Sequence, residues 1–231
     1  MRRSALLALL LIPAVLLCAC SKEEASSQDE QQEVDSLVEK WMADDSTTEA
    51  VTAASDEIDA GATPLDRFSY TIREDGSAVI LKYKGNDKDV VVTSHIGENP
   101  VTEIGQYAFE AAWDIETLTL PDTITVIGEQ AFLDCDSMTT INIPEGVTKL
   151  PRATFAGCCA LAELTIPASV TETQEELLSG CQLTDLHVLN PALTYESWGL
   201  EDLDPKCTIH APEGAAILQW AQENGFPTAT E

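Results

Sequence analysis

The sequence predicts an α+β repeat solenoid: a short stack of coils with a parallel sheet on one face, an N-terminal β-hairpin cap and a C-terminal helix cap. Three observations lead to this fold class. Segments of the chain repeat at a constant step of 23 residues. Every repeat carries the apolar alternation of a half-buried strand, and a proline ends that strand in the first three repeats. One coil cannot enclose its own apolar face, so the coils must stack and share a core.

Four repeats are predicted over residues 101–192. In each, the block L-x-x-L-x-L forms a strand, the Val or Ile after the proline starts the return, and an Ile-Gly pair turns the chain. Stacking at about 4.8 Å per coil makes one parallel sheet. The fourth repeat lacks one residue after Cys181, which shifts its strand by one position. The two clearest aligned columns are Phe109, Phe132, Phe155 and Leu178, and Ala112, Cys135, Cys158 and Cys181.

These repeats resemble the BspA-type leucine-rich repeat, also described from treponemal surface proteins. Ile124–Pro144 and Val147–Pro167 show its pattern nearly throughout, including the Ala-Phe pair, the small residue before Cys and the closing Ile/Leu-x-Ile-Pro. The first repeat departs from it at Ala112, and the fourth at Leu177-Leu178. The resemblance covers about residues 65–231. It implies a leucine-rich-repeat coil stack in a surface lipoprotein that interacts with partners and performs no chemistry.

Residues 65–100 are predicted to form the N-terminal β cap. Phe68–Ile72 and Ala78–Tyr83 both alternate as strands do, and the turn-forming segment Glu74–Ser77 joins them. Val90–Val92 then leads into the first repeat. Such a cap covers the open end of a solenoid and prevents end-to-end stacking.

Residues 193–231 are predicted to form the C-terminal cap. Thr208–His210 is the last expected strand. Pro212 opens a helix that runs from about residue 213 to 224, and Gly225 ends it in the left-handed conformation that glycine tolerates. The apolar side of this helix covers the other end of the core.

Residues 1–19 are predicted to be a lipoprotein signal peptide. Arg2 and Arg3 precede an apolar run from Ala5 to Leu17, which is too short to span a membrane. Leu17-Cys18-Ala19-Cys20 resembles the bacterial lipobox, and this resemblance implies cleavage before Cys20 and lipid on its sulfur. The alternative is an ordinary secretory peptide with an incidental cysteine. The lipobox places the mature chain outside the cytoplasm, anchored to the bacterial cell membrane or surface through lipid.

Residues 20–64 are predicted to be a lipidated, acidic and largely disordered tether. Positions 21–64 carry a net charge of −11, and such a segment buries too little apolar surface to offset its ordering entropy. One patch with helical spacing, Val34 to Met42, has two interpretations. It is a docking helix, or a helix too short to persist alone in water.

Composition excludes several functions. Lys plus Arg number 12 and Asp plus Glu number 40, a net charge of −28, which excludes a general nucleic-acid binder and electrostatic adhesion to anionic lipid. The sequence contains none of the common nucleotide-binding, metalloprotease or serine-hydrolase motifs. The carboxylate pairs Asp134/Asp136 and Asp202/Asp204 do not continue as calcium-binding loops. We therefore expect no catalytic residues, no cofactor and no metal ligands, and no enzyme activity.

Five cysteines remain after the anchor: Cys135, Cys158, Cys159, Cys181 and Cys207. Three of them follow the 23-residue step, so their Cα atoms would lie within disulfide range, but parallel side chains are poorly placed for bridging. Because alanine takes the same slot at Ala112, buried reduced thiols are the favoured interpretation, ahead of disulfides and of a metal site.

The outward side of the predicted sheet is the candidate binding surface, which we call the strand face. Its partner is a protein or glycan of unknown identity, and adhesion or interaction is the predicted role. A structural envelope protein without a soluble ligand is the alternative, and a hydrolase or metal-binding module is less favoured. Trp113 and Trp198 either assist binding or cover the core. The strand face consists of Thr117, Thr119, Thr140, Asn142, Glu163, Thr165, Asp185 and His187.

Overall fold

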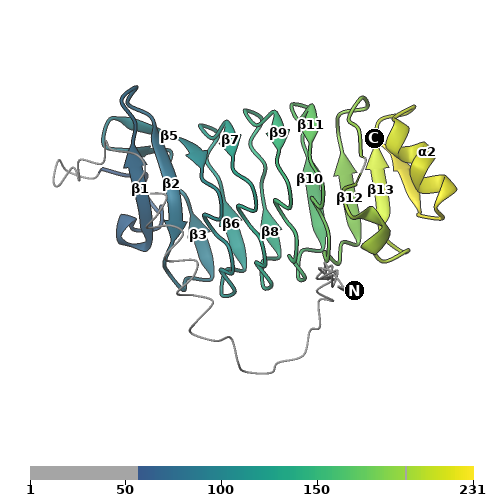
Figure 1. Ribbon diagram of the computed structural model, residues 1–231, viewed down its shortest axis with the longest axis horizontal. Coiled ribbons are helices and arrows are strands. Elements are labelled where there is room, and N and C mark those ends of the chain that lie inside the picture. Colours follow the sequence, from purple (N-terminus) through teal and green to yellow (C-terminus); the bar gives the residue numbers. More distant parts are fainter. Residues whose placement is uncertain (1–56, 196) are drawn as a thin grey trace, which may run out of the picture.

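The computed structural model describes residues 57–195 and 197–231, which wind as a β-solenoid of about seven turns with one C-terminal α-helix. The coils stand side by side along the long axis of the molecule (Figure 1). The predicted signal peptide 1–19, the Cys20 anchor, tether residues 20–56 and the apolar patch 34–42 lie outside the described residues. No helix in the described ranges has the length and apolar character needed to cross a membrane.

The first strand column corresponds to the predicted sheet. Neighbouring strands are parallel and in register, as in Thr117↔Thr140 and Glu163↔Asp185. The column divides into two sheets rather than one, in the orders β3–β6–β8 and β10–β12–β13–β14. The strands are β3 (Asp89–Val91), β6 (Thr117–Thr119), β8 (Thr140–Ile141), β10 (Glu163–Ile166), β12 (Asp185–Val188), β13 (Thr208–Ala211) and β14 (Thr228–Thr230).

A second strand column forms where the chain returns after each proline, and the sequence predicts only its first two strands, those of the N-terminal hairpin. Gly128 follows β7 at a close approach of two coils: a Cβ on it would lie 2.4 Å from the backbone nitrogen of Gln106 in the preceding coil. The chain must turn at that point with a residue that has no side chain. The column contains β1 (Phe68–Ile72), β2 (Ala78–Tyr83), β5 (Asn99–Ile104) and β7 (Val126–Ile127), followed by the pair β9 (Lys149–Leu150) and β11 (Glu172–Thr173).

The third side of each coil also forms a backbone ladder, although it contains no regular strands. Alternate N–H groups donate to carbonyl groups 22 residues further along the chain, as in Phe109 to Ala131, Phe132 to Thr154 and Phe155 to Leu177. Residues with left-handed φ angles of 50° to 59° recur on this side at the 23-residue step. They are Tyr107, Gln130, Ala153 and Glu176.

The N-terminal segment joins the solenoid earlier than the sequence predicts. The hairpin of β1 and β2 follows the predicted residues, and β2 pairs with β5 in parallel. Residues 89–91, assigned by the sequence to the cap, form β3 and pair with β6. The coil from Asp89 to Thr117 takes 28 residues because the short strand β4 (His95–Ile96) and its turn are inserted. The insertion hides this coil from a search at a step of 23.

Residues 57–64 lie against the solenoid, although the sequence includes them in the tether. Thr63 is buried, donates its N–H to the carbonyl of Val91 and accepts the Val91 N–H on its hydroxyl, both at 2.9 Å. The Asp59 carboxylate accepts hydrogen bonds from Ser94, and these bonds lower its pKa. This segment therefore covers the exposed edge of β3, which would otherwise present unpaired backbone groups.

The C-terminal end contains two 3₁₀ or α-helical segments and one unpredicted strand. The 3₁₀ helix η2 spans Leu200–Asp202, and a similar helix, η1, spans Leu65–Arg67 at the other end. The helix α2 spans Ala216–Glu223 and begins about three residues later than predicted. Gly225, at φ 82°, follows the helix as expected. The chain then returns and adds β14 to β13, so Thr208–His210 is not the last strand.

The core is built from columns of identical or similar side chains. The rings of Phe109, Phe132 and Phe155 are fully buried, with neighbouring centroids 5.5 to 5.6 Å apart. Beside them, each column thiol donates to the carbonyl of the phenylalanine one coil earlier; Cys158 Sγ, for example, lies 3.2 Å from the Phe132 oxygen. Cys135, Cys158, Cys181 and Cys207 are buried and free, which confirms the buried-thiol interpretation for the three column cysteines.

The thiol column leads to a prediction about reactivity and pH. Burial raises the pKa of Cys135 and Cys181 to about 12, above the value of about 8.5 for an unfolded thiol. At pH 8 the folded chain should therefore alkylate at these positions about 10³-fold more slowly than the unfolded chain. Their contribution to stability is complete below about pH 8.5 and is lost as the pH rises towards 12. Peptide mass spectrometry after iodoacetamide labelling, with and without guanidinium chloride, measures the difference. Rapid labelling of Cys135 in the folded chain would contradict it.

Candidate binding face of the solenoid

The strand face consists of two rows of side chains that point away from the core. In the first row Thr117 pairs with Thr140, and Glu163 pairs with Asp185. In the second row Thr165 pairs with His187, while Thr119 and Asn142 occupy equivalent positions in the two preceding coils. All eight predicted residues are exposed or half-buried. The structure therefore brings them onto one surface, as the strand alternation predicts.

Asn142 has a structural role on this face. Its side-chain Oδ1 accepts the N–H of Leu120 and its Nδ2 donates to the carbonyl of Leu120, both at 2.8 Å. The amide thus replaces the backbone in the ladder where β8 ends. A partner that used the Asn142 amide would have to break these bonds, so its contribution to the face is shape rather than free hydrogen-bonding groups.

The two ends of the face differ in chemistry. Three threonines of β6 and β8 give the N-terminal part a hydroxyl-bearing surface, and the Thr117 hydroxyl donates to the carboxylate of Asp89 on β3. From β10 onwards the face carries Glu163, Asp185 and His187. A partner would therefore meet mainly threonine hydroxyls, with one carboxylate beside them, at one end and a cluster of carboxylates and imidazoles at the other.

The charged end contains a cluster that the sequence analysis missed. His210 on β13 pairs with His187 on β12, and their rings stack with centroids 4.1 Å apart. His210 Nε2 lies 2.9 Å from Asp185 Oδ1, and this hydrogen bond lowers the pKa of Asp185. His187 Nδ1 contacts Oε1 of Glu231, and its Nε2 lies 3.7 Å from Glu163 Oε1.

One sequence signal for this cluster existed. His210 follows His187 by one 23-residue step, so extending the repeat past residue 192 would have placed the two rings side by side. Glu231 had no such signal, because it reaches His187 only through β14, which the sequence does not predict.

The repeat pattern and the solenoid are shared with known proteins. Residues 89–197 match the profile of the BspA type leucine-rich repeat region in six copies. This stretch is a BspA-type leucine-rich repeat region. The matched stretch begins at β3, so it includes the coil that precedes the first repeat counted from Val101. No curated protein sequence matches the chain at a significant level.

Solved structures show the same leucine-rich repeat fold. The leucine-rich repeat protein of T. pallidum is 26% identical with a TM-score of 0.58, over 64% of this chain and 71% of that one. A leucine-rich cell surface protein from Faecalibacterium prausnitzii is 25% identical with a TM-score of 0.55, over 70% of this chain and 41% of that one. This chain therefore spans less than half of the second protein. A leucine-rich repeat protein from Bacteroides ovatus, 20% identical with a TM-score of 0.51 over 73% of this chain and 52% of that one, shares the fold.

The two tryptophans of the leucine-rich repeat structure have different roles. Trp198 is only 1% exposed, and its indole N–H donates to the Thr173 hydroxyl at 2.7 Å. Of the two alternatives for Trp198, assisting binding or covering the core, the structure therefore shows the second. Trp113 is 50% exposed and lies beside the column of Cys135, away from the strand face. It remains available for contact with a partner.

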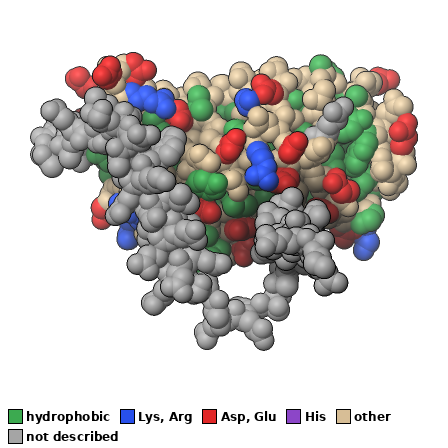
Figure 2. All heavy atoms as spheres, viewed as in Figure 1, with side chains coloured by type: hydrophobic (Ala, Val, Ile, Leu, Met, Phe, Trp, Pro, Cys, Tyr) green, Lys and Arg blue, Asp and Glu red, His purple; other side chains and the backbone are tan. Residues whose placement is uncertain are grey.

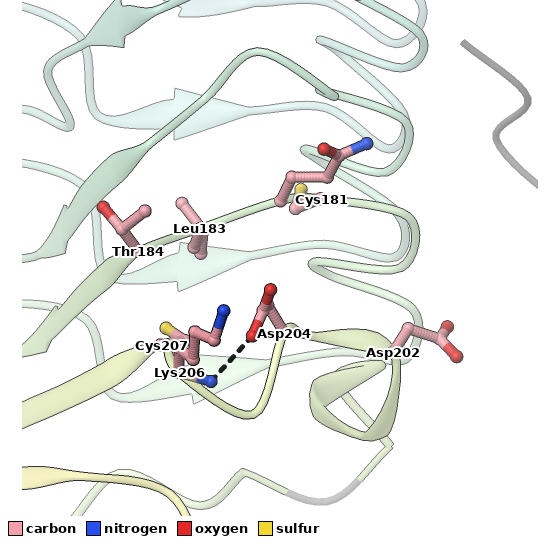
Figure 3. A pocket seen from close by; sticks show the side chains of 8 residues that line it. Cys181, Leu183, Thr184, Asp202, Asp204, Lys206 and Cys207 are labelled. Carbon is pink, nitrogen blue, oxygen red and sulfur yellow. Dashed lines mark hydrogen bonds between the residues drawn. The ribbon is translucent and has the colours of Figure 1, made fainter.

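The spaced carboxylates of the leucine-rich repeat protein do not form an acid pair. Asp202 and Asp204 border a shallow hollow of about 470 Å³. Figure 3 shows Asp202 pointing away from the hollow, while Asp204 turns towards Lys206 and accepts its backbone N–H at 2.8 Å. Two carboxyl groups that catalyse hydrolysis must face each other across the substrate. These two do not, so the hollow gives no support to a hydrolase.

The visible surface has no continuous basic patch. On the face shown in Figure 2, the Lys and Arg side chains are separated by acidic and polar ones. Several of them form ion pairs between coils, as Lys149 does with Glu172 and Arg152 with Glu176.

The role of Asn142 gives a testable prediction. Asn142→Ala removes both side-chain bonds to Leu120, so the free energy of unfolding should fall by about 1–2 kcal/mol. Thr165→Ala, at the next coil of the same row, is the matched control and should change stability by less than about 0.5 kcal/mol. Urea unfolding followed by circular dichroism measures both. Equal stability of the two variants would show that the Asn142 bonds contribute nothing.

Proposed function

We propose that this chain is a lipid-anchored bacterial surface protein whose leucine-rich repeat solenoid binds a protein or glycan through the strand face. The observation that carries this proposal is the strand face itself. It is a regular surface of outward side chains, and none of its predicted residues belongs to the core. A rigid ladder fixes their spacing, so they can match a partner with little loss of conformational entropy.

The anchoring part of the proposal rests on the N-terminal sequence. The charged residues, the apolar run and Cys20 occur in the order that lipid-modified bacterial proteins require. The acidic segment after Cys20 then separates the solenoid from the membrane. The similar F. prausnitzii protein is described as a cell surface protein, which supports an extracytoplasmic location here.

The binding mechanism follows from the composition of the face. It offers threonine hydroxyls and a few charged groups but lacks the Trp, Tyr and Arg anchors of tight interfaces. Each contact is therefore weak, and many copies anchored to one cell would raise the effective concentration enough for stable attachment. A protein or glycan surface that presents repeated hydrogen-bonding groups fits this face.

Arginine substitution on the strand face tests binding. The double variant Thr119→Arg, Thr165→Arg adds two long charged side chains to the outward row and should abolish capture of a partner. The matched control, Thr125→Arg with Thr171→Arg, changes the same residue type at the same separation outside the strand face, where both threonines are exposed. Immobilised chains are probed with host extracellular material and with bacterial envelope extract.

A partner retained by the wild type and the control but lost by the strand-face variant would establish the recognition surface, and its source would separate adhesion from envelope assembly. Capture that is equal in all three chains would place the binding site elsewhere. No capture from either extract, with the chains shown to be folded, would favour the structural envelope role.

Substitution of the lipidation residue tests anchoring. Cys20→Ser should move the chain from the detergent phase to the aqueous phase in Triton X-114 partition, because no acyl chain can attach. Cys18→Ser, two residues earlier, leaves the acceptor cysteine intact and should partition as the wild type does. Retention of Cys20→Ser in the detergent phase would contradict lipid anchoring at this residue.

A further inference from the structure

We propose that His187, His210 and Glu231 bind one divalent transition-metal cation of the zinc type at the C-terminal end of the strand face. One candidate ligand atom from each of the three residues lies within 4.8 Å of the other two. Two imidazoles and one carboxylate are a ligand set that suits zinc, with solvent in the open position. This inference does not depend on the proposed partner binding.

The sheet holds the two histidines in position. His187 and His210 are paired residues of neighbouring parallel strands, so the backbone ladder fixes the separation of their Cα atoms at about 4.8 Å. Metal–nitrogen distances of about 2.0–2.1 Å require ligand atoms roughly 3.4 Å apart in a tetrahedral site. The stacked rings, whose centroids are 4.1 Å apart, must therefore turn so that their ligand nitrogens come within that distance. Both side chains are 21% exposed, so rotation of the rings displaces water rather than packed core.

A carboxylate orients one of the ligands. Oδ1 of Asp185 lies 2.9 Å from Nε2 of His210, so a His210 that donates there presents the Nδ1 lone pair to a cation. Metal-binding histidines usually donate their other N–H to a carboxylate or carbonyl in this way. Glu163, 3.7 Å from His187 Nε2, adds negative charge to a site that already attracts cations.

Glu231 makes the site dependent on the folded chain. Its carboxylate reaches over β13 to His187 on β12, 44 residues earlier in the sequence. A cation held by the three side chains would connect β12, β13 and the residue that follows β14. The unfolded chain does not bring these groups together, so binding must raise the stability of the folded state.

Metal-dependent melting of the purified chain, freed of metal with EDTA, tests the proposal. With ZnCl₂ at about 100 times the dissociation constant, Tm should rise by about 5–10 °C. Isothermal titration calorimetry should give one zinc per chain. CoCl₂ should produce visible absorption bands with the intensity of a four- or five-coordinate site, and MgCl₂ should shift Tm by less than about 1 °C, because Mg²⁺ prefers oxygen ligands.

Three variants and a matched control separate this site from general attraction to an acidic surface. His187→Gln and His210→Gln should each weaken zinc binding at least 100-fold, and Glu231→Gln at least 10-fold. His95→Gln is the control, because His95 also contacts a carboxylate, that of Asp59 at 3.1 Å, but lies in another part of the solenoid. It should bind zinc as the wild type does.

Two results would overturn the proposal. The first is a wild-type chain whose Tm rises no more with ZnCl₂ than with MgCl₂. The second is a folded Glu231→Gln or His210→Gln chain that keeps the wild-type affinity and stoichiometry. Glu231 is an exposed residue that follows β14 and does not belong to the hydrophobic core, so its variant remains informative if a histidine variant fails to fold.

Discussion

Stacking of equivalent side chains in equivalent buried slots is the constraint on which the rest of this structure depends. Phe109, Phe132 and Phe155 occupy one such slot, with ring centroids 5.5 to 5.6 Å apart, and the column thiols occupy the next. Coils that share these slots cannot slide along one another without moving a phenylalanine into a space made for a thiol. The register of every strand ladder follows from this, and so does the arrangement of outward side chains in straight rows.

The stacking constraint is strong enough to override local backbone preference. Tyr107, Gln130, Ala153 and Glu176 all adopt left-handed φ angles of 50° to 59°, at a cost of about 1–2 kcal/mol each for residues with a side chain. A second column of left-handed positions lies four residues further along each coil. It consists of Ala111, Asp134, Gly157 and Gly180. Only half of that column is glycine, so a search for glycine turns could not locate it. The hydrogen bonds between coils on the third side hold the left-handed conformation. In this conformation alternate backbone N–H groups reach the carbonyl groups of the next coil.

The parts of the fold that the sequence predicts are those encoded within one coil. Alternation and proline locate the strands of the first column, and the one-residue offset between core and surface positions assigns the strand face. The second column required knowledge of which segments meet after stacking, since two residues such as Val126 and Ile127 carry no strand pattern of their own. The sequence does not predict the 28-residue coil because an insertion in it breaks the 23-residue step. It does not predict β14 because the helix before that strand breaks the same step. Asn142 was correctly placed on the face, but its role as a substitute for backbone pairing depends on a side-chain rotamer that spacing does not specify.

The same constraint explains why titratable groups gather at one end of the strand face. Side chains one step apart lie opposite each other on adjacent strands, so a single repetition, His187 then His210, doubles the local density of a residue type. Threonines repeated in this way give a row of hydroxyl groups. Histidines repeated in this way place two imidazoles in contact, and they are stable there because Asp185, Glu163 and Glu231 surround them. In a solenoid, a substitution that recurs at the coil step therefore converts part of a passive surface into a site with its own chemistry, while the core beneath it stays unchanged.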